Sequence, residues 1–176
     1  MPNPETKRPT IPDTVWAPLS AAALILFIGL VGLATHQPLL FPSLGPTAFL
    51  QTETPDQPSA RPYNVVTGHL VGLLAGFLAV WVCGAGDAPS VLSVHQLTAP
   101  RVWASVLAIL LTLLVGLLLR ASHPPAAATT LLASLGGFSP TVQSTVTVMS
   151  GVLGVALLGE FLRLVRLRQQ TGGSPP

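Results

Sequence analysis

The chain has 176 residues, of which 49% are hydrophobic and only 8% are charged, and its formal net charge is +2. Because a soluble domain carries about 25% charged residues, this composition excludes a globular domain with a water-exposed surface. The basic residues flank apolar segments instead of forming a patch, which also excludes a nucleic-acid-binding protein. The composition therefore indicates an integral membrane protein that is surrounded by a lipid bilayer.

The N-terminal part of the chain combines a tail with a first membrane span. Residues 1–16 hold four prolines, which predicts a flexible segment. Residues 17–35 are apolar and long enough, at about 1.5 Å per residue, to cross a hydrocarbon core of about 30 Å. The basic residues Lys7 and Arg8 leave a signal peptide cleaved near Ala34 as the alternative. Three further apolar segments follow, however, and they favour a retained helix.

A short apolar segment, FPSLGPTAFL at residues 41–50, comes next. Segments of this length are too short to cross as helices and are commonly re-entrant or interfacial. Pro46 suits the first turn of a helix, Ser43 suits the N-cap, and Gly45 suits a tight turn. Thr47 adds a hydroxyl group. The segment therefore predicts a half-helix whose N-terminus lies inside the membrane.

The second span, residues 64–84, carries a histidine and a row of glycines. The glycines recur at every fourth position, which predicts close packing against another helix. His69 lies on the same helix face and should point into the bundle, where ionisable residues are functional candidates by default. The alternative is a neutral histidine bonded to a neighbouring helix. Asn64, near the membrane boundary, either caps the span or lines an entrance. The glycines are Gly68, Gly72 and Gly76.

The third span, residues 101–119, leads into a second short segment, HPPAAATTLLASL at residues 123–135. Its leading prolines again predict a half-helix that begins inside the membrane. The N-termini of both half-helices would present N–H groups and a partial positive charge to an anion, a common device in transporters. The alternative is a pair of interfacial loops that fill space. The candidate residues here are Ser122, His123, Pro124, Pro125, Thr129 and Thr130.

The fourth span, residues 142–162, precedes a second flexible tail at residues 169–176. Glu160 lies three residues before Arg163, a spacing that allows pairing on a helix. Four crossings would place Arg61 and Arg120 on one side of the membrane. The positive-inside rule then predicts that both termini lie in the cytoplasm. The membrane we expect is a bacterial plasma membrane. The basic residues predicted on the cytoplasmic side are Lys7, Arg8, Arg101, Arg163, Arg166 and Arg168.

The order of elements suggests an internal repeat over residues 17–168. A shift of 82 residues pairs Pro42 with Pro124 and Thr47 with Thr129. Repeats of this kind are inverted if the short segments cross the membrane and parallel if they do not, and we expect the parallel form. The predicted fold is an all-α membrane protein with four transmembrane helices and two proline-led re-entrant half-helices. Four helices and two half-helices would form only a thin wall around a cavity, which also predicts a homo-oligomer.

No arrangement of residues indicates catalysis. The sequence has no P-loop, no GxGxxG fingerprint and no serine–histidine–aspartate set. Its four histidines are not accompanied by clustered carboxylates or cysteines, which makes a metal site a poor interpretation. We therefore expect neither an enzyme nor a bound cofactor.

The motif His123-Pro124-Pro125, followed by an alanine- and threonine-rich half-helix, resembles the signature of the HPP family of integral membrane proteins. The segment at residues 41–50 resembles the first conserved segment of that family. The likeness extends from the first span to the fourth. Further matches leading into the second span are Pro62, Asn64, Val65, Gly68 and His69. Members often have a basic residue directly before the asparagine, where this chain has Tyr63.

The resemblance implies a four-helix membrane fold and, for some plant and cyanobacterial members, nitrite transport. The first hypothesis is a channel or carrier for a small anion, with nitrite as the leading candidate. His69 or His123 can gain or lose a proton in the physiological range, which allows proton coupling. The glycine-rich packing surface supports a second hypothesis, a non-transporting membrane subunit. A channel for a neutral solute such as ammonia or water is the third.

Overall fold

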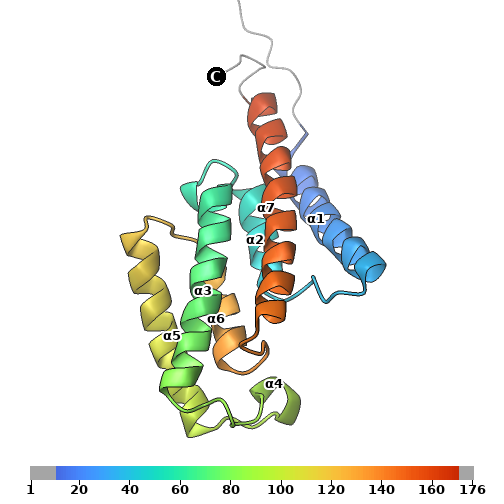
Figure 1. Ribbon diagram of the computed structural model, residues 1–176. Helices are drawn as coiled ribbons and strands as arrows, with labels where there is room; N and C mark the ends of the chain where they lie inside the picture. Colours follow the sequence, from blue (N-terminus) through green and yellow to red (C-terminus); the bar gives the residue numbers. More distant parts are fainter. Residues whose placement is uncertain (1–10, 171–176) are drawn as a thin grey trace, which may run out of the picture.

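The computed structural model describes residues 11–170, and all of its regular structure in that range is helical (Figure 1). Four helices are long and apolar enough to cross a membrane, which confirms the predicted spans. These are α1 (Asp13–Thr35), α3 (Pro62–Val82), α5 (Ala99–Leu118) and α7 (Val142–Gln170). The short elements are α2 (Leu44–Glu53), η1 (Pro58–Ala60), α4 (Val91–Val94) and α6 (Ala126–Ser134).

The helix boundaries differ from the predicted segments by a few residues. Both half-helices, α2 and α6, begin three residues later than predicted, because Pro42 and the Pro124-Pro125 pair lie in the turns that lead into them. Helix α1 begins earlier, at Asp13, whose negative charge suits a helix N-terminus. Helix α7 continues to Gln170, beyond the predicted span. The rest of both predicted tails, residues 1–10 and 171–176, lies outside the described residues.

Side-chain contacts along α7 establish the direction of α2. Near the start of α7, Thr147 donates a hydrogen bond to the side chain of Gln37 (3.2 Å). Near its end, Arg163 donates to the carbonyl of Pro55 (3.1 Å). The segment that contains α2 therefore runs alongside α7 in the same direction, from the end of the bundle where α7 begins to the end where α1 begins and α7 ends (Figure 1). We call these the far end and the terminal end.

Helix α6 runs in the opposite direction. Its last residue, Ser134, accepts a hydrogen bond from Arg101, which lies at the start of α5 at the far end (3.1 Å). Just before its first residue, His123 bonds to the carbonyl of Ser59 in the connection at the terminal end (2.8 Å). Helices α1, α2 and α3 thus alternate in direction, and α5, α6 and α7 alternate in the reverse order (Figure 1).

This arrangement corrects the predicted parallel repeats: the two three-helix units are inverted. An extended chain rises about 3.3 Å per residue against 1.5 Å for a helix, so the non-helical residues 36–43 bring the chain halfway along the bundle before α2 begins. The predicted shift of 82 residues places Leu44 on Ala126 and Thr47 on Thr129 in the structure too. Whether the two segments are re-entrant with respect to a bilayer stays a prediction.

The inverted order also corrects the predicted distribution of charge. The Tyr63 hydroxyl at the start of α3 donates to the carbonyl of Leu119 at the end of α5 (2.9 Å). The adjoining Arg61 and Arg120 therefore lie at the terminal end, and of the described basic residues Arg101 lies at the far end. The basic residues at the terminal end are Arg61, Arg120, Arg163, Arg166 and Arg168. The charge asymmetry is stronger than predicted.

Arg101 has a structural role at the far end. Its side chain is 5% exposed and donates to the carbonyls of Ser134 (3.1 Å) and Ala88 (2.6 Å). It packs over Gly136, whose φ of +85° suits a residue without a side chain. These contacts fasten the end of α6 to the connection between α3 and α5.

We expect Arg101→Ala to lower the free energy of unfolding by about 2–4 kcal/mol, because two buried carbonyl groups lose their donor and a void remains. Unfolding in detergent, followed by circular dichroism, measures this loss. Arg61→Ala is the control, since the Arg61 side chain is exposed, and it should change stability by less than about 0.5 kcal/mol. Equal losses in the two variants would show that the buried contacts contribute nothing.

Candidate functional site

Five of the predicted site residues meet where the two half-helices begin. Ser43, Thr47, His69 and Thr129 are fully buried, and His123 is 5% exposed. We call these five residues the central cluster. They come from α2, α3, α6 and the turns before the half-helices, and they are joined by hydrogen bonds although they are far apart in the sequence. The structure therefore brings the two predicted half-helices to one place.

His69 lies between the half-helices and contacts both. Its Nδ1 is 2.7 Å from the Thr129 hydroxyl on α6, and its Nε2 is 3.0 Å from the Thr47 hydroxyl on α2. Thr47 and Thr129 are equivalent under the shift of 82 residues, so the ring lies near the pseudo-twofold axis that relates the inverted units. The Ser43 hydroxyl, 2.7 Å from the Thr129 hydroxyl, joins the half-helices directly.

His123 extends the cluster toward the terminal end. Its Nε2 is 3.1 Å from the Thr47 hydroxyl, and its Nδ1 is 2.8 Å from the carbonyl oxygen of Ser59. The rings of His69 and His123 lie edge to face with their centroids 5.0 Å apart. Within the described part of the chain, both rings bond to hydroxyl or carbonyl groups. The cluster thus offers polar groups without a fixed charge.

The N-termini of the two half-helices offer fewer free N–H groups to an anion than the sequence predicted. The first amides of α2, at Leu44 and Gly45, donate to the carbonyls of Phe41 and Pro42. Three amides of α6 are paired in the same way with the carbonyls of the preceding turn, and they belong to Ala126, Ala127 and Ala128. These amides are therefore paired within the chain, because each half-helix opens with a tight turn. The donors left to a ligand are hydroxyl groups and ring nitrogens.

The predicted caps are also absent from both half-helices. Ser43 occupies the N-cap position of α2, but its hydroxyl bonds to Thr129 instead of to the helix backbone. Pro125 occupies the N-cap position of α6, and Ser122 is exposed. At Ser43, the hydrogen bond to Thr129 of the other half-helix therefore takes the place of an N-cap bond.

The other predicted site residues lie around the cluster without joining it. Thr130 bonds to Thr112 of α5 (3.0 Å) and has no hydrogen bond to a member of the cluster among the described residues. Gly45 and Pro46 form the first turn of α2, where a side chain added at Gly45 would meet open space. Pro46 and Pro124 are exposed.

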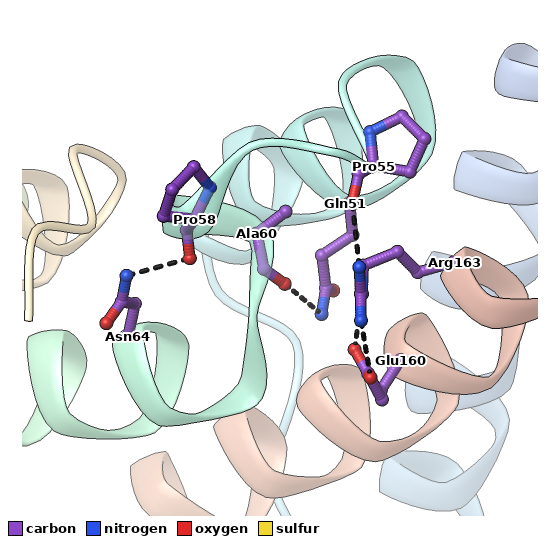
Figure 2. Close-up of polar contacts among 7 residues, drawn as sticks. All are labelled: Gln51, Pro55, Pro58, Ala60, Asn64, Glu160 and Arg163. Carbon is purple, nitrogen blue, oxygen red and sulfur yellow. Dashed lines mark hydrogen bonds and ion pairs between the residues drawn. The ribbon is translucent and has the colours of Figure 1, made fainter. Parts of the chain in front are cut away.

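Asn64 holds the connection between α2 and α3 (Figure 2). Its side-chain amide donates to the carbonyl of Pro58 (2.7 Å), and Gln51 donates to the carbonyl of Ala60 (3.5 Å). Arg163 donates to the carbonyl of Pro55 and to Glu160, the pairing that the sequence predicted. These contacts fix the connection that contains Ser59, the partner of His123.

Sequence reasoning missed both Gln51 and Ser59. Gln51 is fully buried on α2, and its Oε1 has no hydrogen-bond partner in the described structure. Its position in the polar sequence QTET, directly after the predicted half-helix, gave no signal of burial. Ser59 acts through its backbone carbonyl, so its side chain could not have indicated the contact.

A cavity of about 240 Å³ lies beside the cluster, between α3, α5 and α6. His123 forms part of its wall, together with Ser122 and Thr112, while most of the remaining lining is apolar. His123 is therefore the member of the central cluster that borders open space.

Comparisons with known proteins give one match. The family model described as "HPP, transmembrane region" matches residues 6–168. No curated protein and no solved structure matches the chain. The matched range includes both half-helices and every residue of the central cluster.

Proposed function

The chain belongs to the HPP transmembrane family, and from this premise we propose that it transports a small anion, with nitrite as the leading candidate, along a path through the central cluster. The observation that carries this proposal is a group of five hydrogen-bonded polar side chains buried halfway along an apolar bundle. Polar and ionisable groups at this depth are costly and usually mark a route for a substrate. Simple packing of the half-helices would need none of them.

The chemistry of the cluster supports an oxyanion. Hydroxyl and ring N–H groups donate hydrogen bonds to oxygen atoms, and three hydroxyls and two rings lie within one hydrogen-bonded group. The absence of a fixed cation among them suits transport, because a substrate must also be released. The exposed Arg61 at the terminal end would raise the local concentration of anions.

We further propose that the terminal end faces the cytoplasm of a bacterial cell and that the protein forms homo-oligomers. The first proposal is supported by the excess of arginine at that end. The second is supported by the thin wall that six helical segments provide around the cluster.

Purified protein in liposomes is expected to take up nitrite about tenfold faster than protein-free liposomes, a modest rate for a transporter with a buried site. The measurement is the initial rate of nitrite accumulation at neutral pH. A variant with alanine at Pro124, Pro125 and His69 should return the rate to the protein-free value. Equal uptake by native and variant protein would place the path elsewhere.

The paired helix amides favour a second candidate, a channel for an uncharged solute such as ammonia, because they leave the cluster with little positive potential. Stopped-flow measurement of ammonia entry into the same liposomes separates the two functions. Entry of ammonia without nitrite would select the second candidate. A lack of flux for both would indicate the non-transporting subunit.

A further inference from the structure

The central cluster contains one hydrogen bond more than its neutral side chains can donate. Six contacts join its members to one another and to the carbonyls of Ser43 and Ser59. The neutral side chains supply five protons, one for each of the five residues. One contact must therefore lack a proton when the cluster is uncharged.

The carbonyl of Ser59 sets the direction of the hydrogen bonds in the arrangement in which the Thr47 hydroxyl donates to His123. A carbonyl only accepts, so Nδ1 of His123 donates to it, and Nε2 of a neutral His123 must accept from the Thr47 hydroxyl. Thr47 then accepts from Nε2 of His69. Nδ1 of His69 accepts from Thr129, which in turn accepts from Ser43. The protons form a chain with a single direction from Ser43 to Ser59.

The Thr47 hydroxyl has one proton for two acceptors, so when it donates to Nε2 of His123, its contact with the carbonyl of Ser43 (3.0 Å) is left without a proton. A sixth proton resolves this. When it forms an N–H bond at Nε2 of His123, that nitrogen donates to Thr47. The Thr47 hydroxyl then rotates and donates to the Ser43 carbonyl. All six hydrogen bonds are made, and no heavy atom has to move.

Among residues 11–170, the surroundings of the cluster supply no negative charge for the extra proton. On α3, His69 is the ionisable group that faces His123. On α7, Glu160 is paired with Arg163, and Glu53 at the end of α2 is exposed. On α5, Arg101 lies at the far end. A lone positive charge buried among these apolar helices is costly unless an anion accompanies it.

We propose that the central cluster binds one proton together with each anion, so that the protein is an electroneutral proton–anion symporter. This inference rests on the proposed anion transport and names its coupling ion. The proton is taken from water and returned to water on the opposite side of the membrane, with the anion, so that no net charge moves. His123 receives the proton because it borders the cavity between α3, α5 and α6.

The test uses native protein in liposomes that contain a fluorescent pH indicator, with nitrite added outside. Initial rates in protein-free liposomes are subtracted, because nitrous acid crosses bilayers unaided. We expect one proton to enter with each nitrite ion. A membrane potential of about 100 mV, which shifts the equilibrium of one moving charge about 50-fold, should leave the nitrite rate unchanged.

Thr47→Val removes the hydroxyl that links both histidines and keeps the volume of the side chain. It should lower the proton-coupled nitrite rate about tenfold, and the remaining flux should no longer respond to a pH gradient. Thr52→Val is the matched control, because Thr52 is also buried on α2 and bonds only within its own helix, to Ala48 and Phe49. It should retain the native rate and the native response to pH.

The possible results separate this inference from the proposed function. Nitrite uptake that follows the membrane potential and brings in no proton would overturn symport and leave anion transport in place. A complete lack of nitrite uptake by folded native protein would overturn both. Full proton coupling in Thr47→Val would overturn the assignment of the proton to the cluster.

Discussion

Replacement of His69 by alanine is expected to return nitrite uptake to the protein-free rate, because the ring makes two hydrogen bonds and each is worth about a factor of ten. The side chain is fully buried and contacts Thr47 on one half-helix and Thr129 on the other. Without it, both hydroxyl groups lose a partner, and the two inverted units lose the group that joins them at their pseudo-twofold axis.

The initial rate of nitrite uptake into liposomes, at equal amounts of inserted protein, measures the effect. His69→Gln keeps a donor and an acceptor on a side chain of similar reach. It should therefore elute as native protein in size-exclusion chromatography and retain more uptake than the alanine variant. His95→Asn is the control, since His95 is exposed at the far end and asparagine tolerates its φ of 54°. Native uptake by His69→Ala would exclude His69 from the path.

The double replacement Gly72→Ala and Gly76→Ala is expected to have the largest effect on stability, a loss of about 4 kcal/mol, since overpacking costs about 1–3 kcal/mol at each position. A Cβ at Gly72 would lie 2.6 Å from the Thr130 hydroxyl and 2.9 Å from the Ala126 carbonyl. A Cβ at Gly76 would lie 2.5 Å from the Cβ of Ala133. Helix α6 would have to move away from α3, and the central cluster would open.

The midpoint of thermal unfolding in detergent measures this loss. Gly29→Ala is the matched control, because Gly29 also lies within a long apolar helix, and its nearest neighbour would be 3.8 Å from the new Cβ. Alanine there should be neutral or slightly stabilising, by up to about 1 kcal/mol. If the double variant unfolds at the same temperature as Gly29→Ala, the close approach of α3 and α6 does not determine stability.

The positions of the long helices could be predicted from the sequence because they depend on local hydropathy. Runs of apolar residues defined the four long helices, and the prolines defined where α2 and α6 begin to within three residues. The glycine spacing in α3 correctly indicated a close helix contact, which the structure shows to be with α6. These features are encoded within short stretches of chain.

The directions of the half-helices could not be predicted in this way. A helix of ten residues gives no sign of the depth at which it begins, and the extended residues 36–43 decide that depth. The same error led to the wrong placement of Arg61 and Arg120. Each of these arginines lies in a connection, and the directions of the two helices that it joins decide at which end of the bundle the connection lies. Arg101 was interpreted as a topological signal, whereas its buried side chain is a structural donor.

Residue type was a good guide to the central cluster and a poor guide to its partners. Histidine, serine and threonine within apolar segments must find hydrogen bonds, so Ser43, Thr47, His69, His123 and Thr129 were all identified. Their backbone partners, such as the carbonyl of Ser59, carry no residue-specific signal. The pairing of the helix amides within each turn was likewise set by local backbone geometry.

The inverted arrangement of the two units has a consequence for biosynthesis. Such a pair has the same order of long and short helices whichever way up it is placed, so this order gives the insertion machinery little reason to prefer one orientation. The choice then falls to arginines near the ends of the helices, and of those in the described chain all but Arg101 lie at the terminal end. A handful of cations would thereby decide which compartment each half of the inverted pair faces.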